Sequence, residues 1–116
     1  MKNVKLFAPV SSGRSWLSRK IVKALGDKVG YVTIIDEMVV SDSYKYEVSD
    51  KFLYICLGFA SVPEDALRPK QKAEELLEQS KKWKEFADKH NIQYFDVTKR
   101  DEKTYDDIVQ WVQENI

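Results

Sequence analysis

A run of polar residues near the start of the sequence has the composition of an anion-binding loop. It reads Ser11-Ser12-Gly13-Arg14-Ser15 and follows a short apolar segment. Serine hydroxyls donate hydrogen bonds, glycine permits a turn that a side chain would block, and arginine can bind phosphate through two parallel hydrogen bonds. We therefore predict that residues 11–15 bind a phosphate group. The alternative is a polar turn in which Ser15 caps the helix that follows.

The segments on either side of this loop predict the unit that would hold the anion. Residues 4–8 are short and apolar, as is typical of a buried strand. Leu17, Ile21 and Leu25 recur at helical spacing, and Gly26 stands where a left-handed C-cap is expected. A helix N-terminus offers N–H groups and a positive partial charge to an anion. Ligands of open α/β sheets also bind at the carboxyl ends of strands, which is where this loop falls.

The rest of the chain alternates strand and helix patterns. The segments predicted are strands over 31–40, 52–59 and 92–97, a helix from Pro69 to His90, and a last helix opened by a capping box of Thr104 and Asp107. Residues 41–50 fit either an edge strand or a short crossover helix. This order predicts one α/β domain over residues 1–116, a three-layer sandwich with a mostly parallel sheet of four to five strands and helices on both faces.

Composition narrows the classes of protein. Nineteen basic and nineteen acidic residues give a formal net charge of zero, which argues against general nucleic-acid binding. The single cysteine, Cys56, lies in an apolar run, so we expect a buried core residue in a reducing compartment. No apolar segment suggests a signal peptide or a membrane span. We expect a cytoplasmic protein without membrane association, and the oligomeric state stays open.

The loop resembles a degenerate nucleotide P-loop. That family has Gly or Ala, four residues, Gly-Lys, then Ser or Thr, and here Ala8, Gly13 and Ser15 match while Arg14 replaces the Lys. The resemblance implies a protein that binds a phosphorylated small molecule, a nucleotide with Mg²⁺ above all. Because the missing Lys normally contacts the terminal phosphates, it also implies weak or no phosphoryl transfer. An enzyme of this kind would be a small kinase-like or NTPase-like phosphotransferase, with catalytic residues unassigned.

The same resemblance implies functional roles for residues in two further parts of the sequence. Residues 32–37 are similar to a Walker B strand, which ends in two acids, and this implies that Asp36 and Glu37 contact Mg²⁺ or the phosphoryl acceptor. Arg68 lies where the lid of a nucleotide kinase could supply an arginine. These residues complete the site that a nucleotide-binding interpretation predicts.

Two other families share parts of the loop. Cys-dependent phosphatases and the related sugar-transport phosphocarrier domains have Cys, five residues, Arg, then Ser or Thr. Arg14 and Ser15 fit, but Ala8 stands where the nucleophile belongs, so no covalent phosphoenzyme is expected. The loop also resembles the one with which flavodoxins hold the phosphate of FMN, which implies that Phe59 or Tyr44 flanks a flavin. A non-catalytic interaction domain is the remaining alternative.

Structural roles are expected for most of the other residues that could bind a ligand or act in catalysis. Trp16 directly follows the loop and could stack on a base, or it could pack against the first helix. We expect a structural role for His90, the only histidine, near a helix C-terminus. Without a cluster of Cys and His, no zinc site is expected. An acidic patch is expected to be solvated; its members are Asp101, Glu102, Asp106 and Asp107.

Overall fold

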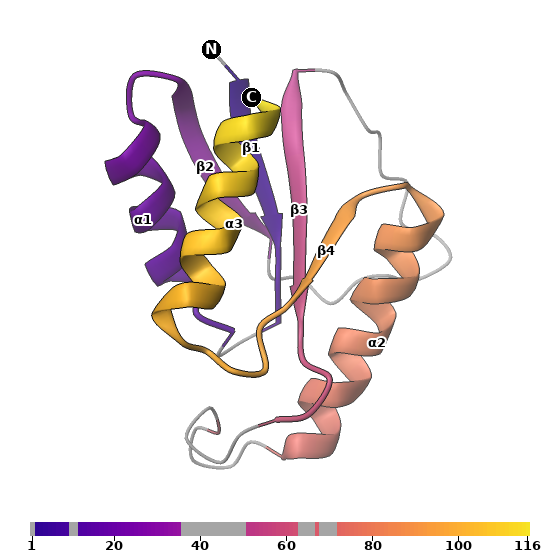
Figure 1. Cartoon of the computed structure of the whole chain (residues 1–116). Coiled ribbons are helices and arrows are strands. Elements are labelled where there is room, and N and C mark those ends of the chain that lie inside the picture. The colour runs from indigo at the N-terminus through magenta and orange to yellow at the C-terminus, as the bar shows by residue number, and fades with distance from the viewer. Residues whose placement is uncertain (1, 10–11, 36–50, 63–66, 68–71) are drawn as a thin grey trace.

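A parallel sheet flanked by helices forms the body of the protein (Figure 1). This computed structural model describes residues 2–9, 12–35, 51–62, 67 and 72–116. Its elements are β1 (Lys2–Phe7), α1 (Arg14–Leu25), β2 (Val29–Ile35), β3 (Phe52–Gly58), α2 (Ala73–Lys89), β4 (Gln93–Asp96) and α3 (Glu102–Asn115). None of the helices in these ranges combines the length and apolar character that a membrane crossing requires.

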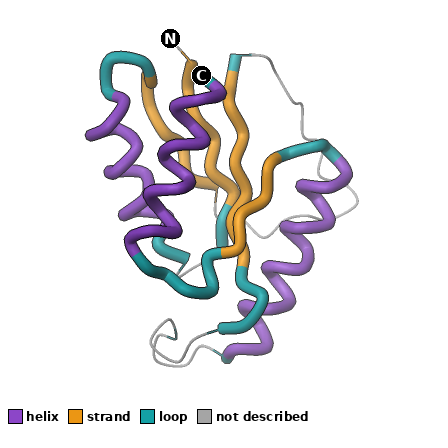
Figure 2. The backbone as a smooth tube through the Cα atoms, viewed as in Figure 1, coloured by secondary structure: helices purple, strands orange, loops and turns teal. Residues whose placement is uncertain are grey.

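The four described strands are all parallel and lie in the order β2-β1-β3-β4 (Figure 2). β1 is central, with Lys5 in register with Thr33 of β2 on one side and with Tyr54 of β3 on the other. Strands covered on both faces need apolar side chains on both faces. β3 is an unbroken apolar run, and Val4, Leu6 and Phe7 of β1 are buried, so the predicted α/β fold with a parallel sheet is confirmed.

Helices cover both faces of the sheet, which makes three layers. Side chains of β1 and β3 alternate: Leu6 and Ile55 face a core shared with α1 and α3, whereas Phe7 and Cys56 face α2. In the α2 layer, Trp83 is 1% exposed and packs its ring against Phe7. The thiol of Cys56 is buried and donates to the Trp83 carbonyl at 3.5 Å, and burial raises its pKa. The expected role of Cys56 in the core is confirmed.

Two helix ends differ from the sequence-based expectations. Gly26 has right-handed backbone angles, with φ −54°, so the predicted left-handed C-cap is wrong. The predicted capping box at Thr104 is also wrong, because Asp101 is the N-cap of α3 and its carboxylate accepts from the Thr104 N–H at 2.9 Å. Asp caps a helix as well as Ser or Thr does. The earlier cap lets α3 begin at Glu102 and includes Tyr105 in its second turn.

Strand and helix boundaries shift by a few residues elsewhere. β2 begins at Val29, two residues before the predicted strand, and β4 is confirmed within the predicted range. α2 begins at Ala73, whereas its predicted start at Pro69 lies outside the described residues. The open question of residues 41–50 lies outside them as well.

Candidate functional site

The strand order marks where a ligand would bind. From β1 the chain passes through α1 to β2 on one side, while β3 lies on the other side of β1. Open α/β sheets bind ligands in the crevice outside the carboxyl ends of the two strands at such a reversal. The connections that leave β1 and β3 at this edge begin at Ala8 and Phe59 (Figure 1). The loop predicted from sequence therefore lies at this point of the sheet.

The Ser12 side chain forms a hydrogen bond inside the β1–α1 loop. Its side chain is completely buried, and its hydroxyl donates to the Pro9 carbonyl at 2.7 Å. A serine hydroxyl has a single hydrogen to donate. Because that hydrogen is used inside the loop, a contribution of Ser12 to anion binding would come from its backbone N–H.

Gly13 is required at the start of α1 for two reasons. It is the N-cap and has φ +77°, a left-handed conformation that favours glycine. A Cβ atom at this position would also lie 2.8 Å from Cζ of Tyr105 and closer still to the hydroxyl oxygen. No side-chain cap bond is present at this helix end, and Ser15, expected as the cap in the alternative interpretation, is exposed one residue into α1. Gly13 has no side chain, so no N-cap side chain binds the first N–H groups of α1.

Tyr105 holds the loop from α3. Its side chain is 1% exposed, and its hydroxyl donates to the carbonyl oxygen of Ser12 at 2.7 Å. Burial raises the pKa of Tyr105, and this effect outweighs the opposing effect of the nearby Arg100 guanidinium. Tyr105 was not among the site residues predicted from the sequence. Its spacing in α3 predicts burial but gives no sign of a bond to a loop 93 residues away.

Arg14 folds back across the loop. Its Nη1 atom donates to the carbonyl oxygen of Ala8 at 3.3 Å, so the guanidinium lies at the carboxyl end of β1 and is partly buried. A guanidinium carries five N–H donors and a permanent positive charge. The first N–H groups of α1, including those of Arg14, Ser15 and Trp16, have no acceptor within the helix. Charge and N–H donors thus occur together at one end of the sheet.

A second arginine reaches the same region from the β4–α3 turn. Arg100 has φ +49°, which is uncommon outside glycine, and its guanidinium is close enough to Tyr105 to oppose the rise in the pKa of that residue. Tyr105 in turn contacts Ser12 and adjoins Gly13. Arg100 was not among the residues predicted from the sequence. Its position just after the fourth strand, at the same edge as the loop, is the signal that could have found it.

Hydrogen bonds join the β3 and β4 ends beside the loop. Oδ1 of Asp96 accepts from the Thr98 N–H at 2.9 Å, the Thr98 hydroxyl at 2.5 Å and the Ala60 N–H at 3.3 Å. Oγ1 of Thr98 accepts from the N–H groups of Ala60 and Ser61. Burial alone would raise the pKa of Asp96, but these hydrogen bonds outweigh it and the pKa is lowered. The carboxylate fixes the start of the β3 connection.

Several predicted site residues lie outside the described part of the chain. They are Ser11, Asp36, Glu37, Tyr44 and Arg68. Phe59 is described and is 4% exposed, so it offers no free face to a flavin. His90 is the C-cap residue of α2, and its ring lies 4.6 Å from that of Phe86. In the ranges that the structure describes, no group of three or more His, Cys, Asp or Glu could hold a metal ion.

Comparison of the chain with models of protein families, with curated proteins and with solved structures finds no match. The strand order and the contacts of the β1–α1 loop are therefore the observations that bear on function. The fold brings Ser12, Gly13, Arg14 and Ser15 to one edge of the sheet. Tyr105 and Arg100, from the last part of the chain, lie next to them.

Proposed function

We propose that the protein binds a phosphorylated small molecule, a nucleotide first of all, at the β1–α1 loop. One observation carries the proposal: the Arg14 side chain folds back to the Ala8 carbonyl, so that its charge lies at the carboxyl end of β1. Arginine favours phosphate because its planar donors match two phosphate oxygens at once. Backbone N–H groups of the first turn of α1 supply further donors for the same group.

The same loop favours binding over catalysis. An active nucleotide P-loop has Lys where this chain has Arg14, and an active phosphatase loop has Cys where it has Ala8. Ala8 is completely buried and cannot attack phosphorus. These substitutions support a protein that holds its phosphate without rapid turnover.

FMN is the second candidate ligand, and the strand order favours it. The order β2-β1-β3-β4 reproduces the first four strands of the flavodoxin-like order, in which FMN binds between β1 and β3. The phosphate of FMN would use the same loop. The buried position of Phe59 counts against this candidate, because Phe59 is one of the two alternative residues expected to flank the flavin.

Titrations monitored by amide chemical shifts test both candidates. Phosphate, ATP with Mg²⁺, and FMN would each be added to the protein, and the largest shifts are expected at residues 12–15. Arg14→Ala should weaken binding about tenfold or more, since a hydrogen bond to a charged group contributes roughly 1.5–3 kcal/mol. Arg14→Lys should restore only part of the affinity, because lysine lacks the two-pronged geometry.

Lys28→Ala is the matched control. It removes the same charge at the opposite end of α1, where Lys28 lies in the turn before β2. This variant should bind phosphate as the wild type does. Equal affinity of wild type and Arg14→Ala, or largest shifts away from residues 12–15, would contradict the proposal. A flavin that co-purifies and colours the protein yellow would favour FMN over a nucleotide.

A further inference from the structure

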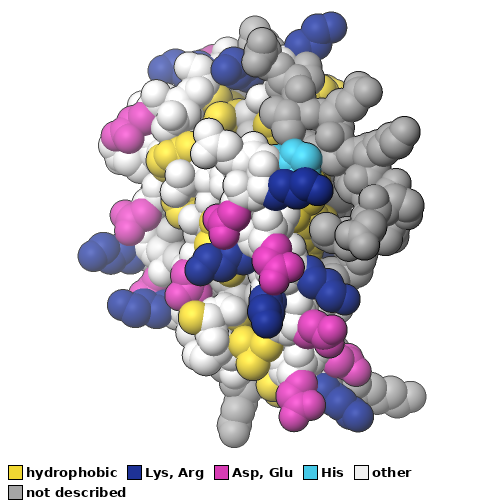
Figure 3. Space-filling model, turned by 90° about the vertical axis from the view of Figure 1, so that its right-hand side faces the viewer, with side chains coloured by type: hydrophobic (Ala, Val, Ile, Leu, Met, Phe, Trp, Pro, Cys, Tyr) yellow, Lys and Arg dark blue, Asp and Glu magenta, His cyan; other side chains and the backbone are white. Residues whose placement is uncertain are grey.

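Helix α1 carries charge of only one sign. It contains Arg14, Arg19, Lys20 and Lys23 and no acid, although the whole chain is neutral. The other two described helices carry both signs. Figure 3 shows this mixture on the side of the molecule that α2 covers, where basic and acidic side chains alternate. The solvent-facing side of α1 therefore differs from the rest of the described helical surface.

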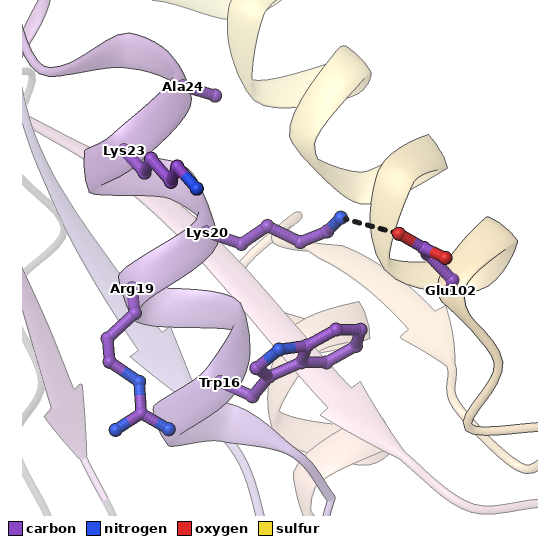
Figure 4. A pocket seen from close by; sticks show the side chains of 6 residues that line it. All are labelled: Trp16, Arg19, Lys20, Lys23, Ala24 and Glu102. Atoms are coloured by element: carbon purple, nitrogen blue, oxygen red, sulfur yellow. Dashed lines mark ion pairs between the residues drawn. The ribbon is translucent and has the colours of Figure 1, made fainter.

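A groove runs between α1 and α3. It has a volume of about 640 Å³ and is lined by Trp16, Arg19, Lys20, Lys23, Ala24 and Glu102 (Figure 4). Four of these residues lie one or two turns apart on α1, at positions 16, 19, 20 and 23, and so share one face of the helix. The groove is separate from the contacts that Arg14 and Ser12 make in the β1–α1 loop.

Trp16 presents an exposed but fixed aromatic surface to this groove. The residue is 41% exposed, while Trp83 is buried and most of the large apolar side chains form the core. Its ring lies 4.9 Å from that of Tyr105 at 82°, and the Lys20 ammonium lies 5.3 Å from its centroid. An aromatic side chain that is already held in place loses little conformational entropy on binding. Such residues are frequent anchors of protein interfaces.

The groove has one wall formed by α1 and one formed by α3, and the acids of α3 pair with only some of the basic side chains of α1. Lys20 reaches across the groove to Asp106 at 2.5 Å and to Glu102 at 3.8 Å, and the hydrogen bond with Asp106 raises its pKa. Within the described residues, neither Arg19 nor Lys23 has an ion pair. These two lie four residues apart on α1, which separates them by about 6 Å along the helix axis.

We infer that the groove docks an acidic peptide segment of a partner protein. Two carboxylates of that segment pair with Arg19 and Lys23, and an apolar side chain covers Trp16. Alternate residues of an extended peptide are about 6.6 Å apart, close to the spacing of the two basic side chains. The inference goes beyond the proposed phosphate site, since it needs neither Arg14 nor the β1–α1 loop.

The opposite wall argues against a nucleic acid as the occupant. The side chains of Glu102 and Asp106 are 77% and 55% exposed along α3. A nucleic-acid strand carries a negative charge about every 3.4 Å, so its phosphates would meet these carboxylates. A short peptide can place its two acids on the α1 side alone.

The test uses a capped peptide in which Glu alternates with Ala around one central Leu. A peptide with Gln in place of every Glu is its control. The indole N–H signal of Trp16, assigned by its loss in Trp16→Phe, and the amides of α1 should shift with the acidic peptide. Arg19→Gln with Lys23→Gln should lower the affinity by roughly 2- to 30-fold, since each of the two exposed ion pairs that are lost contributes about 0.2–1 kcal/mol. Lys82→Gln with Lys89→Gln, which removes two charges from α2, should leave it unchanged.

Three results with the peptides would overturn the inference. They are equal binding of the acidic and the Gln peptides, shifts that map away from Trp16 and α1, and unchanged affinity of the Arg19→Gln, Lys23→Gln variant. Tighter binding of single-stranded oligothymidylate with the same shifts would also overturn it, and would assign the groove to nucleic acid. Phosphate titration of residues 12–15 remains a separate readout, so failure here and failure of the phosphate site are distinguishable.

Discussion

The hydroxyl of Tyr105 donates a hydrogen bond of 2.7 Å to the carbonyl oxygen of Ser12 and so joins α3 to the β1–α1 loop. Both residues are almost completely buried. A buried carbonyl that loses its donor keeps the cost of its desolvation. The conformation of the candidate phosphate loop therefore depends on a residue of the last helix.

Tyr105→Phe should destabilise the protein by about 1–3 kcal/mol, because the buried Ser12 carbonyl would lose its donor. Urea unfolding would measure the change. Tyr31→Phe is the matched control, since Tyr31 is 53% exposed and should tolerate the loss of its hydroxyl. Phosphate affinity should fall in Tyr105→Phe and not in the control. An unchanged midpoint for Tyr105→Phe would show that the bond contributes nothing to stability.

Gly13→Ala should destabilise the protein by more than the unfavourable backbone conformation alone would account for. A left-handed alanine costs about 1–2 kcal/mol, and its Cβ would also collide with Tyr105. Gly13→Asn separates the two effects, because Asn tolerates this conformation but still carries a Cβ. We expect Asn to be nearly as destabilising as Ala in thermal unfolding. If Asn restores wild-type stability, the close approach of Tyr105 has no energetic consequence.

Turnover should be slow or absent. We expect a coupled ATPase assay with Mg²⁺ and a phosphomonoester screen to give rates far below the roughly 1–100 s⁻¹ usual for kinases. A rate inside that range, abolished by Arg14→Ala, would show that Arg14 replaces the missing Lys. Ala8→Cys is the complementary variant. Because Ala8 is completely buried, we expect no new phosphatase activity from it, and such activity would favour the Cys-loop resemblance.

Asp96 should make stability depend on pH in the acid range. Its pKa is lowered below the ordinary 3.8 because hydrogen bonds from Thr98 and Ala60 outweigh the effect of burial. A carboxyl whose pKa is lower in the folded state stabilises the fold above its unfolded-state pKa, and this stabilisation is lost as the pH falls through the folded value. Asp96→Asn should therefore reduce stability at pH 6 and change it much less at about pH 2. Urea unfolding at both values would measure this, and an equal effect at the two would refute the assignment.

The fold could be predicted because its signals are local. The apolar run of β3 and the helical spacing of Leu17, Ile21 and Leu25 are patterns within single elements. The ends of the helices could not be predicted in this way. Asp101 and Thr104 are both good N-cap residues for α3, and only the packed structure decides between them.

The candidate site was chosen from the composition of residues 11–15, and its geometry could not be predicted. Ser12 was chosen for its hydroxyl, yet that hydroxyl faces Pro9 inside the loop. Nothing in residues 11–15 indicates the bond to Tyr105 or the approach of Arg100, because both come from the far end of the chain. Contacts between residues so distant in sequence depend on the order of the strands, which local patterns do not encode.

The bond between Tyr105 and Ser12 also has a consequence for biosynthesis. A ribosome that has completed β4 has made all four described strands but not yet the residue that holds the Ser12 carbonyl. The loop can therefore reach its final conformation only after residue 105 has left the exit tunnel and α3 has docked.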